Sequence, residues 1–118
     1  MGAAACGGGE ESSGSAASSG ASEGSNLKVG LAYDVGGRGD QSFNDAAAAG
    51  LDRAKAELNL AEARELSAAP GETDAQKEER LRLLASSGFN PIIAVGFAYS
   101  GPLGKVAKEF PDVKFAIV

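Results

Sequence analysis

The chain has 118 residues, with 11 Lys and Arg against 16 Asp and Glu, a formal net charge of −5, one Cys and no His. The lack of His excludes a Ser-His-Asp triad and a His-ligated zinc site, and a single Cys excludes an internal disulfide. The basic residues are not gathered into a stripe, so we expect no nucleic-acid partner. The sequence contains no run of about 18 apolar residues, which a membrane-spanning helix would need. Nothing in the composition calls for a metal or a cofactor.

The first 26 residues form a segment of distinct composition, with 7 Gly, 7 Ser and 6 Ala. Small residues cannot bury enough apolar surface to offset the entropy of ordering, so the segment is predicted to be a flexible tether in front of a folded region, residues 27–118. Cys6 lies between three Ala and three Gly. This arrangement resembles the processing site of bacterial lipoproteins, which implies lipidation of Cys6. The alternative is a free cysteine in an N-terminal arm.

The folded region begins with a strand and a helix. Residues 27–33 are mostly apolar and run into a glycine-rich loop, which predicts a buried strand. The helix that follows is predicted from apolar residues at steps of three and four, with Asp40 or Ser42 as its cap. Its expected buried stripe consists of Phe43, Ala47, Leu51, Ala54 and Leu58.

Residues 60–67 predict a second, weaker strand, because they contain few β-branched side chains. A capping box of Thr73 and Gln76 then predicts a helix that ends before Gly88. Four consecutive apolar residues, 92–95, suit a central parallel strand. The inward positions expected in this second helix are Leu81, Leu84 and Ala85.

A third helix is predicted from Ser100, with Pro102 in its first turn, and a fourth strand from residues 113–118. Alternating strands and helices predict an α/β fold: a parallel sheet with flanking helices, in the strand order 2-1-3-4. We also expect the chain to be a fragment, because an apolar and unprotected strand is a poor end for a soluble protein. The expected apolar stripe of the third helix is Leu103, Val106, Ala107 and Phe110.

Two loops are candidates for a site, because ligands of open parallel sheets bind at the carboxyl ends of the strands. They are residues 34–45 and residues 96–101, and both combine glycines with an aromatic and short polar groups. In the first loop, Gly37 and Gly39 fit a dinucleotide fingerprint, but Ser42 occupies the place of the third glycine. A phosphate-binding loop would need a Lys followed by Ser or Thr, which this loop does not contain. Residues 38–40 match an Arg-Gly-Asp adhesion tripeptide.

A further interpretation of the first loop is a pocket for a neutral, polar, flat ligand. Phe43 would offer a stacking face, and Asp34, Ser42 and Asn44 would offer hydrogen bonds. The alternative is structural, with Phe43 in the core of the fold and Ser42 as no more than a helix cap. The residue pattern alone leaves both open.

A family resemblance bears on that choice. Residues 29–34 (Val-Gly-Leu-Ala-Tyr-Asp) and 39–45 (Gly-Asp-Gln-Ser-Phe-Asn-Asp) resemble the N-terminal signature of the basic membrane protein family, also called PnrA-like. Residues 90–97 and 110–116 resemble its second and third segments. The resemblance implies the N-terminal lobe of a type I periplasmic-binding fold, with a nucleoside held between two lobes, as in the substrate-binding lipoproteins of nucleoside ABC importers.

Carried over by position, the resemblance implies that Phe43 stacks on the base and that Asp34 and Asn44 hydrogen-bond the nucleoside. Gly96 and Phe97 would line the same cleft, and Ser42 would support the loop. The expected protein is not an enzyme: it would be anchored to the cell membrane on the extracytoplasmic face and serve an ABC permease and its ATPase. The alternatives are a Rossmann-like enzyme with a nucleotide cofactor, and a sugar or amino-acid receptor or sensor lobe of the same fold.

Overall fold

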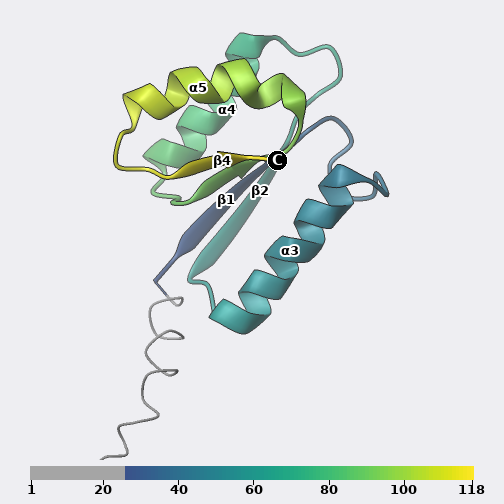
Figure 1. Cartoon of the computed structure of the whole chain (residues 1–118), viewed down its shortest axis with the longest axis vertical. Helices are drawn as coiled ribbons and strands as arrows, with labels where there is room; N and C mark the ends of the chain where they lie inside the picture. The colour runs from purple at the N-terminus through teal and green to yellow at the C-terminus, as the bar shows by residue number, and fades with distance from the viewer. Residues whose placement is uncertain (1–25) are drawn as a thin grey trace, which may run out of the picture.

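The computed structural model describes residues 26–118, and Cys6 with the rest of the predicted tether lies outside the described residues. Strands and helices alternate along the described part, as the sequence predicts (Figure 1). A short 3-10 helix, which the sequence did not predict, precedes the last α-helix. The elements are β1 (Lys28–Tyr33), α3 (Phe43–Leu58), β2 (Glu62–Ser67), α4 (Asp74–Ser86), β3 (Ile92–Ala94), η2 (Phe97–Tyr99), α5 (Ser100–Glu109) and β4 (Phe115–Ile117).

The four strands form one parallel sheet in the order β2-β1-β3-β4, which confirms the predicted fold class and strand order. In the register of the sheet, Tyr33 at the end of β1 lies opposite Ser67 at the end of β2, and Ala94 at the end of β3 lies opposite Ile117 of β4. All strands therefore end at one edge, which we call the carboxyl edge. The loops that leave this edge can meet around a ligand.

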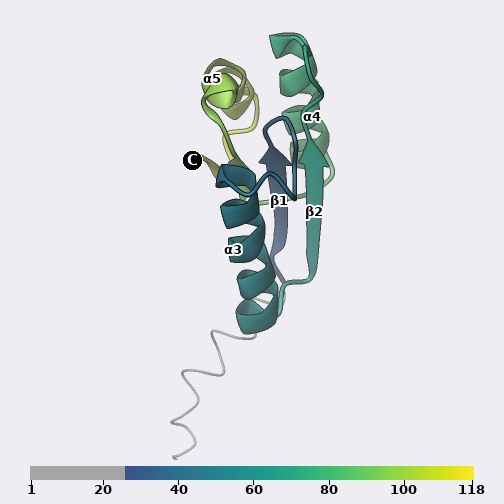
Figure 2. The same ribbon diagram turned by 90° about the vertical axis from the view of Figure 1, so that its right-hand side faces the viewer.

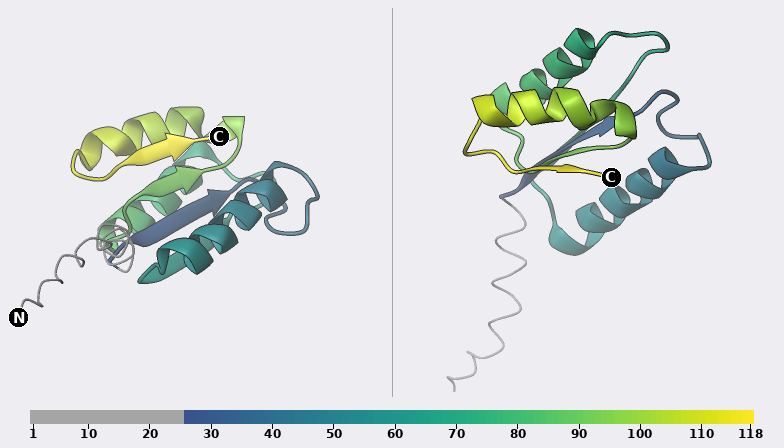
Figure 3. Two further views of the ribbon diagram at one scale, coloured as in Figure 1. Left: turned by 60° about the horizontal axis from the view of Figure 1, so that its bottom comes forward. Right: turned by 45° about the horizontal axis from the view of Figure 1, so that its top comes forward.

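The two faces of the sheet are covered by different helices (Figures 2 and 3). Successive side chains of a strand point to opposite faces. Leu31 of β1 therefore belongs to the same core cluster as Leu51 of α3, and Ala32 belongs to a second cluster with Leu84 of α4 and Val106 of α5. The predicted inward residues of α4, namely Leu81, Leu84 and Ala85, are all buried, and its capping box is formed.

Gly30 lies where α4 approaches the sheet. A Cβ atom at this position would stand 3.3 Å from both methyl carbons of Leu84 and from Cβ of Phe89. The missing side chain therefore lets α4 pack close to β1.

The expected stripe of α3 is wrong at its two ends. Phe43 is 72% exposed and Leu58 is 44% exposed, whereas the buried residues of the helix are Asn44, Ala48 and Leu51. The cause is local, because the side chain of Asn44 is bonded to the backbone at the end of β1, and this turns Phe43 away from the sheet. None of the helices between residues 26 and 118 is both long enough and apolar enough to cross a membrane.

Candidate functional site

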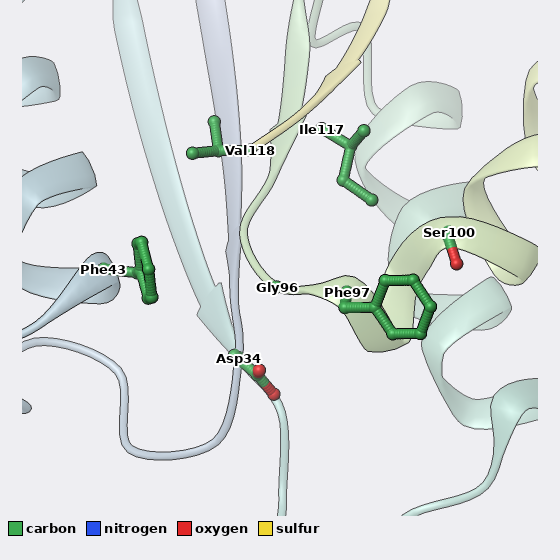
Figure 4. Close-up of a pocket in the computed structure, with 7 residues that line it drawn as sticks. All are labelled: Asp34, Phe43, Gly96, Phe97, Ser100, Ile117 and Val118. Carbon is green, nitrogen blue, oxygen red and sulfur yellow. The ribbon is translucent and has the colours of Figure 1, made fainter.

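A pocket of about 510 Å³ opens at the carboxyl edge of the sheet. Phe43, at the start of α3, and Phe97, at the start of η2, stand on opposite sides of it, with Asp34 and Gly96 between them (Figure 4). Both rings are turned to solvent, with exposed fractions of 72% and 89%. The lining residues are Asp34, Phe43, Gly96, Phe97, Ser100, Ile117 and Val118.

Asp34 supplies the charged group of this pocket. Its Oδ1 accepts a hydrogen bond from the backbone N–H of Val35 at 2.8 Å, and no hydrogen bond to Oδ2 is found among the described residues. Gly96 makes room for this carboxylate: its φ is 110°, and a Cβ atom there would stand 2.8 Å from Cγ of Asp34. An ionised carboxylate only accepts hydrogen bonds, so the pocket favours ligands that donate them.

The loop between β1 and α3 is ordered by its own carboxylates. Asp40 accepts hydrogen bonds from the backbone N–H groups of Ser42 at 2.9 Å, Asn44 at 3.2 Å and Asp45 at 2.9 Å. Burial opposes ionisation of Asp40, but these backbone hydrogen bonds outweigh it and lower its pKa. Asp40 is therefore the residue that caps α3; Ser42 stands at the N-cap position, but its side chain makes no capping hydrogen bond.

Asp45 completes this arrangement, since it accepts from the N–H groups of Gly39 at 2.6 Å and Gln41 at 3.0 Å. A dinucleotide or phosphate site needs free N–H groups at the start of a helix. Here the N–H groups of Asn44 and Asp45 in the first turn of α3 already bind Asp40. Those of Gly39 and Gln41 in the loop already bind Asp45. The glycines of this loop therefore do not form a phosphate cradle.

Asn44, expected to contact a ligand, is buried to 1% exposure and does not line the pocket. Its Oδ1 accepts from the N–H of Asp34 at 3.1 Å, and its Nδ2 donates to the carbonyl oxygens of Asp34 at 3.2 Å and Val35 at 3.3 Å. The amide thus holds Asp34 in place. Ser42 is exposed and also lies outside the lining of the pocket.

Arg38 ties the loop between β1 and α3 to neighbouring elements. Its guanidinium donates to both carboxylate oxygens of Asp52, at 3.0 and 2.7 Å, and to Glu65 at 2.6 Å, which joins the loop to α3 and β2. The hydrogen bond from Arg38 lowers the pKa of Glu65, which also accepts from the hydroxyl of Tyr33 at 2.6 Å. The Arg of the adhesion tripeptide is thus engaged within the fold.

Sequence reasoning placed Ser100 in the second candidate loop without naming it as a site residue, and it missed Ile117 and Val118 as lining residues. Ile117 and Val118 come at the end of β4, so the rule that ligands bind at carboxyl ends of strands could have indicated them.

A second hollow, of about 590 Å³, lies near the end of β2. Two charged residues that line it, Glu72 and Arg80, are hydrogen-bonded to each other. Between residues 26 and 118, no three His, Cys, Asp or Glu side chains are placed to hold a metal ion.

Comparison with known proteins gives the family. The profile of the Bmp family, described as ABC transporter substrate-binding protein PnrA-like, matches residues 27–118. An uncharacterized lipoprotein of Pyrococcus horikoshii is 39% identical over 100 residues, which cover 81% of this chain and 23% of that protein. An uncharacterized lipoprotein of Pyrococcus abyssi is 40% identical over 96 residues, which cover 81% of this chain and 23% of that protein. The chain therefore spans about a quarter of the length of these relatives.

Solved structures agree with the fold. An ABC transporter system solute-binding protein from Aeropyrum pernix K1 is 40% identical with a TM-score of 0.68, and the match covers 77% of this chain and 24% of that one. One from Conexibacter woesei is 32% identical with a TM-score of 0.60, over 75% and 28% of the two chains. The fold and family that the sequence resemblance implied are confirmed. The chain belongs to the Bmp family of PnrA-like ABC transporter substrate-binding proteins.

Proposed function

We propose that this chain is the nucleoside-capturing part of an extracytoplasmic solute-binding protein that delivers its ligand to an ABC import permease and its ATPase. The observation that carries the proposal is one pocket with exposed aromatic rings on opposite sides and a carboxylate between them. The membership of the chain in a family of substrate-binding proteins supports the transport role.

The chemistry of the pocket favours a nucleoside over other small solutes. Phe43 and Phe97 offer apolar ring faces to a flat base. Asp34 accepts hydrogen bonds from N–H or O–H groups, which a nucleoside has on its base and its ribose. N–H groups in the first turn of α3 bind Asp40, those of the preceding loop bind Asp45, and the chain carries a net charge of −5. A ligand with a phosphate would therefore meet repulsion without a compensating cradle.

The exposure of the two rings also predicts the affinity of the chain. Binding sites for small molecules bury most of the surface of their ligand. Because Phe43 and Phe97 remain 72% and 89% exposed, this part of the protein encloses a base only partly. We therefore expect this chain by itself to bind nucleosides with a Kd of roughly 1 mM or weaker.

The test is a titration of the isotopically labelled chain, followed by two-dimensional amide NMR, which detects binding at this strength. Adenosine, guanosine and uridine should shift the amide signals of Asp34, Phe43, Gly96 and Phe97. The matched 5′-monophosphates should bind more weakly. If no nucleoside shifts these signals in the folded chain, the substrate assignment is wrong. Equal or tighter binding of the monophosphates would favour a nucleotide site, and binding of ribose or amino acids alone would favour another class of receptor.

We further propose that residues 1–26 link a lipid on Cys6 to the αβ lobe formed by residues 27–118, on the extracytoplasmic face of the cell membrane. The similar proteins of Pyrococcus are named lipoproteins, and Cys6 stands between small residues. Mass spectrometry of the protein isolated from membranes of its source should find the N-terminal peptide beginning at a diacylglycerol-modified Cys6. An unmodified Cys6 in that material would contradict the anchor.

A further inference from the structure

Tyr99 occupies an unusual place beside the pocket. It is the last residue of η2 and is completely buried, although Phe97, two residues earlier, is 89% exposed. Its hydroxyl donates a hydrogen bond to the carbonyl oxygen of Tyr33 at 3.0 Å. Tyr33 directly precedes Asp34, and Tyr99 directly precedes Ser100. One phenol therefore joins the two segments that supply Asp34, Phe97 and Ser100 to the pocket.

The same hydroxyl is held from its other side by Arg80 of α4, whose Nη1 donates to it at 3.0 Å. Glu72 fixes the guanidinium with two hydrogen bonds, at 2.7 and 2.6 Å, and also accepts from the N–H of Ala69 at 3.1 Å. The side chains of Glu72 and Arg80 are only 3% and 13% exposed. Buried charges of this kind depend on each other, because removing one leaves the other without compensation.

This network is separate from the ligand-facing groups. Tyr99, Arg80 and Glu72 do not line the pocket at the carboxyl edge. The carbonyl oxygen of Tyr33 also accepts from the N–H of Ala68 at 3.0 Å, so it stays bonded if the phenol is lost. The ring of Tyr99 packs in the same core cluster as Leu81 and Val106. Loss of the hydroxyl alone would therefore remove this side-chain link, while it preserves the packing and the backbone hydrogen bond of 2.8 Å from the N–H of Val95 to the carbonyl oxygen of Ala32.

We propose that Tyr99, held by Arg80 and Glu72, is a positioning residue of the binding site: its hydroxyl sets the distance between Asp34 and Phe97 and so the affinity for the ligand. The inference rests on the proposed function for its ligand and on the hydrogen bonds for its geometry. Three buried side chains that do not line the pocket would thereby affect how tightly it binds a ligand.

The experiment compares Tyr99→Phe with Tyr33→Phe. Both variants remove one phenolic oxygen, but the hydroxyl of Tyr33 bonds to Glu65 on the α3 side and does not connect the pocket segments. In the NMR titration with adenosine, Tyr99→Phe should weaken binding at least fivefold, and Tyr33→Phe should change it less than twofold. Glu72→Gln, at the far end of the network, should act in the same direction as Tyr99→Phe.

A second measurement does not need a ligand. In amide hydrogen exchange, Tyr99→Phe should speed the exchange of the N–H groups of Gly96 and Tyr99 at least fivefold, while those of α3 keep their rates. Unchanged exchange at both positions would overturn the proposal, as would an equal loss of affinity in Tyr99→Phe and Tyr33→Phe. If the folded wild-type chain binds no nucleoside but the exchange responds as expected, the proposed substrate is wrong and the positioning role of Tyr99 stands.

Discussion

The two segments that form the pocket are held in place in different ways. The loop before α3 is ordered from within, because Asp40, Asn44 and Asp45 bond to backbone groups of the same stretch of chain. The segment after β3 is held mainly by other parts of the fold. Backbone hydrogen bonds run from the N–H of Val95 to the carbonyl oxygen of Ala32 in β1 and from the N–H of Gly96 to that of Val118. The buried hydroxyl of Tyr99 adds a side-chain link to Tyr33 and to Arg80 of α4.

This difference teaches that the sides of a binding site can owe their shape to local or to distant contacts. A loop with many short-range hydrogen bonds tolerates changes elsewhere in the fold. A segment that depends on a partner such as Tyr33, 66 positions away in the chain, responds to changes far from the ligand.

The largest effect is expected where the two segments touch. In Gly96→Ala, the new Cβ would meet the carboxyl group of Asp34, and the φ of 110° is unfavourable for a side chain. We expect a loss of about 1–3 kcal/mol in the free energy of unfolding and a loss of nucleoside binding. Urea denaturation and the NMR titration measure these two quantities.

The control for this change is Gly104→Ala. Gly104 lies within α5, and no atom stands within 4 Å of its added Cβ, so the chain should become more stable by about 0.5–1 kcal/mol. If Gly96→Ala were as stable as Gly104→Ala and still bound nucleosides, the close contact between the two segments would be without importance.

The second prediction compares the two aromatic rings. Phe43→Ala and Phe97→Ala should each weaken nucleoside binding by roughly 1–3 kcal/mol, by analogy with stacking of bases on aromatic side chains. The exposure of both rings implies little change in folding stability, within about 0.5 kcal/mol. Leu58→Ala, at the other end of α3, is the control and should leave binding unchanged. An unaltered affinity in Phe43→Ala would remove that ring from the site.

The smallest effect is expected on mild acidification, which acts on the Glu72–Arg80 pair that holds Tyr99. The hydrogen bond from Arg80 lowers the pKa of Glu72 to about 2, against an unfolded value of 4.5. Because the folded pKa is the lower one, the stabilising contribution of Glu72 is complete above pH 4.5 and is lost as the pH falls towards 2. The stability difference between wild type and Glu72→Gln should therefore narrow between pH 5 and pH 3.

Glu57→Gln provides the comparison for this pH dependence. Glu57 pairs with Arg53 on the exposed surface of α3, where the two side chains are 58% and 78% exposed. Exposed pairs of this kind contribute little to stability. Denaturation curves of Glu57→Gln should follow those of wild type at every pH, and a constant gap between Glu72→Gln and wild type would contradict the role of the buried pair.

The sequence predicted the regular elements well, because each depends on short-range patterns. The capping box at Thr73, the apolar run that becomes β3 and the stripe of α4 all have the structure that their periodicity indicates. The strand order followed from general rules for parallel sheets. The expected stripe of α3 was right at Leu51 but wrong at Phe43 and Leu58, because periodicity alone cannot show that Asn44 faces inward to bond the end of β1.

The site was predictable only in part. The sequence pointed to Asp34, Phe43, Gly96 and Phe97, and the structure brings these four together around one pocket. It gave no sign of the bonds among Glu72, Arg80 and Tyr99, which join residues 8 and 19 positions apart through burial of polar groups. Buried ion pairs have no periodic pattern, so only the three-dimensional structure reveals them.

The hydroxyl of Tyr99 also has a consequence for how such proteins diverge. Selection on ligand preference usually acts on side chains that touch the ligand, and these are constrained by the ligand itself. Here the distance between Asp34 and Phe97 is governed from α4 and η2, through residues that do not line the pocket at the carboxyl edge. Descendants of this chain could therefore acquire a new preference while every residue in contact with the ligand stays the same.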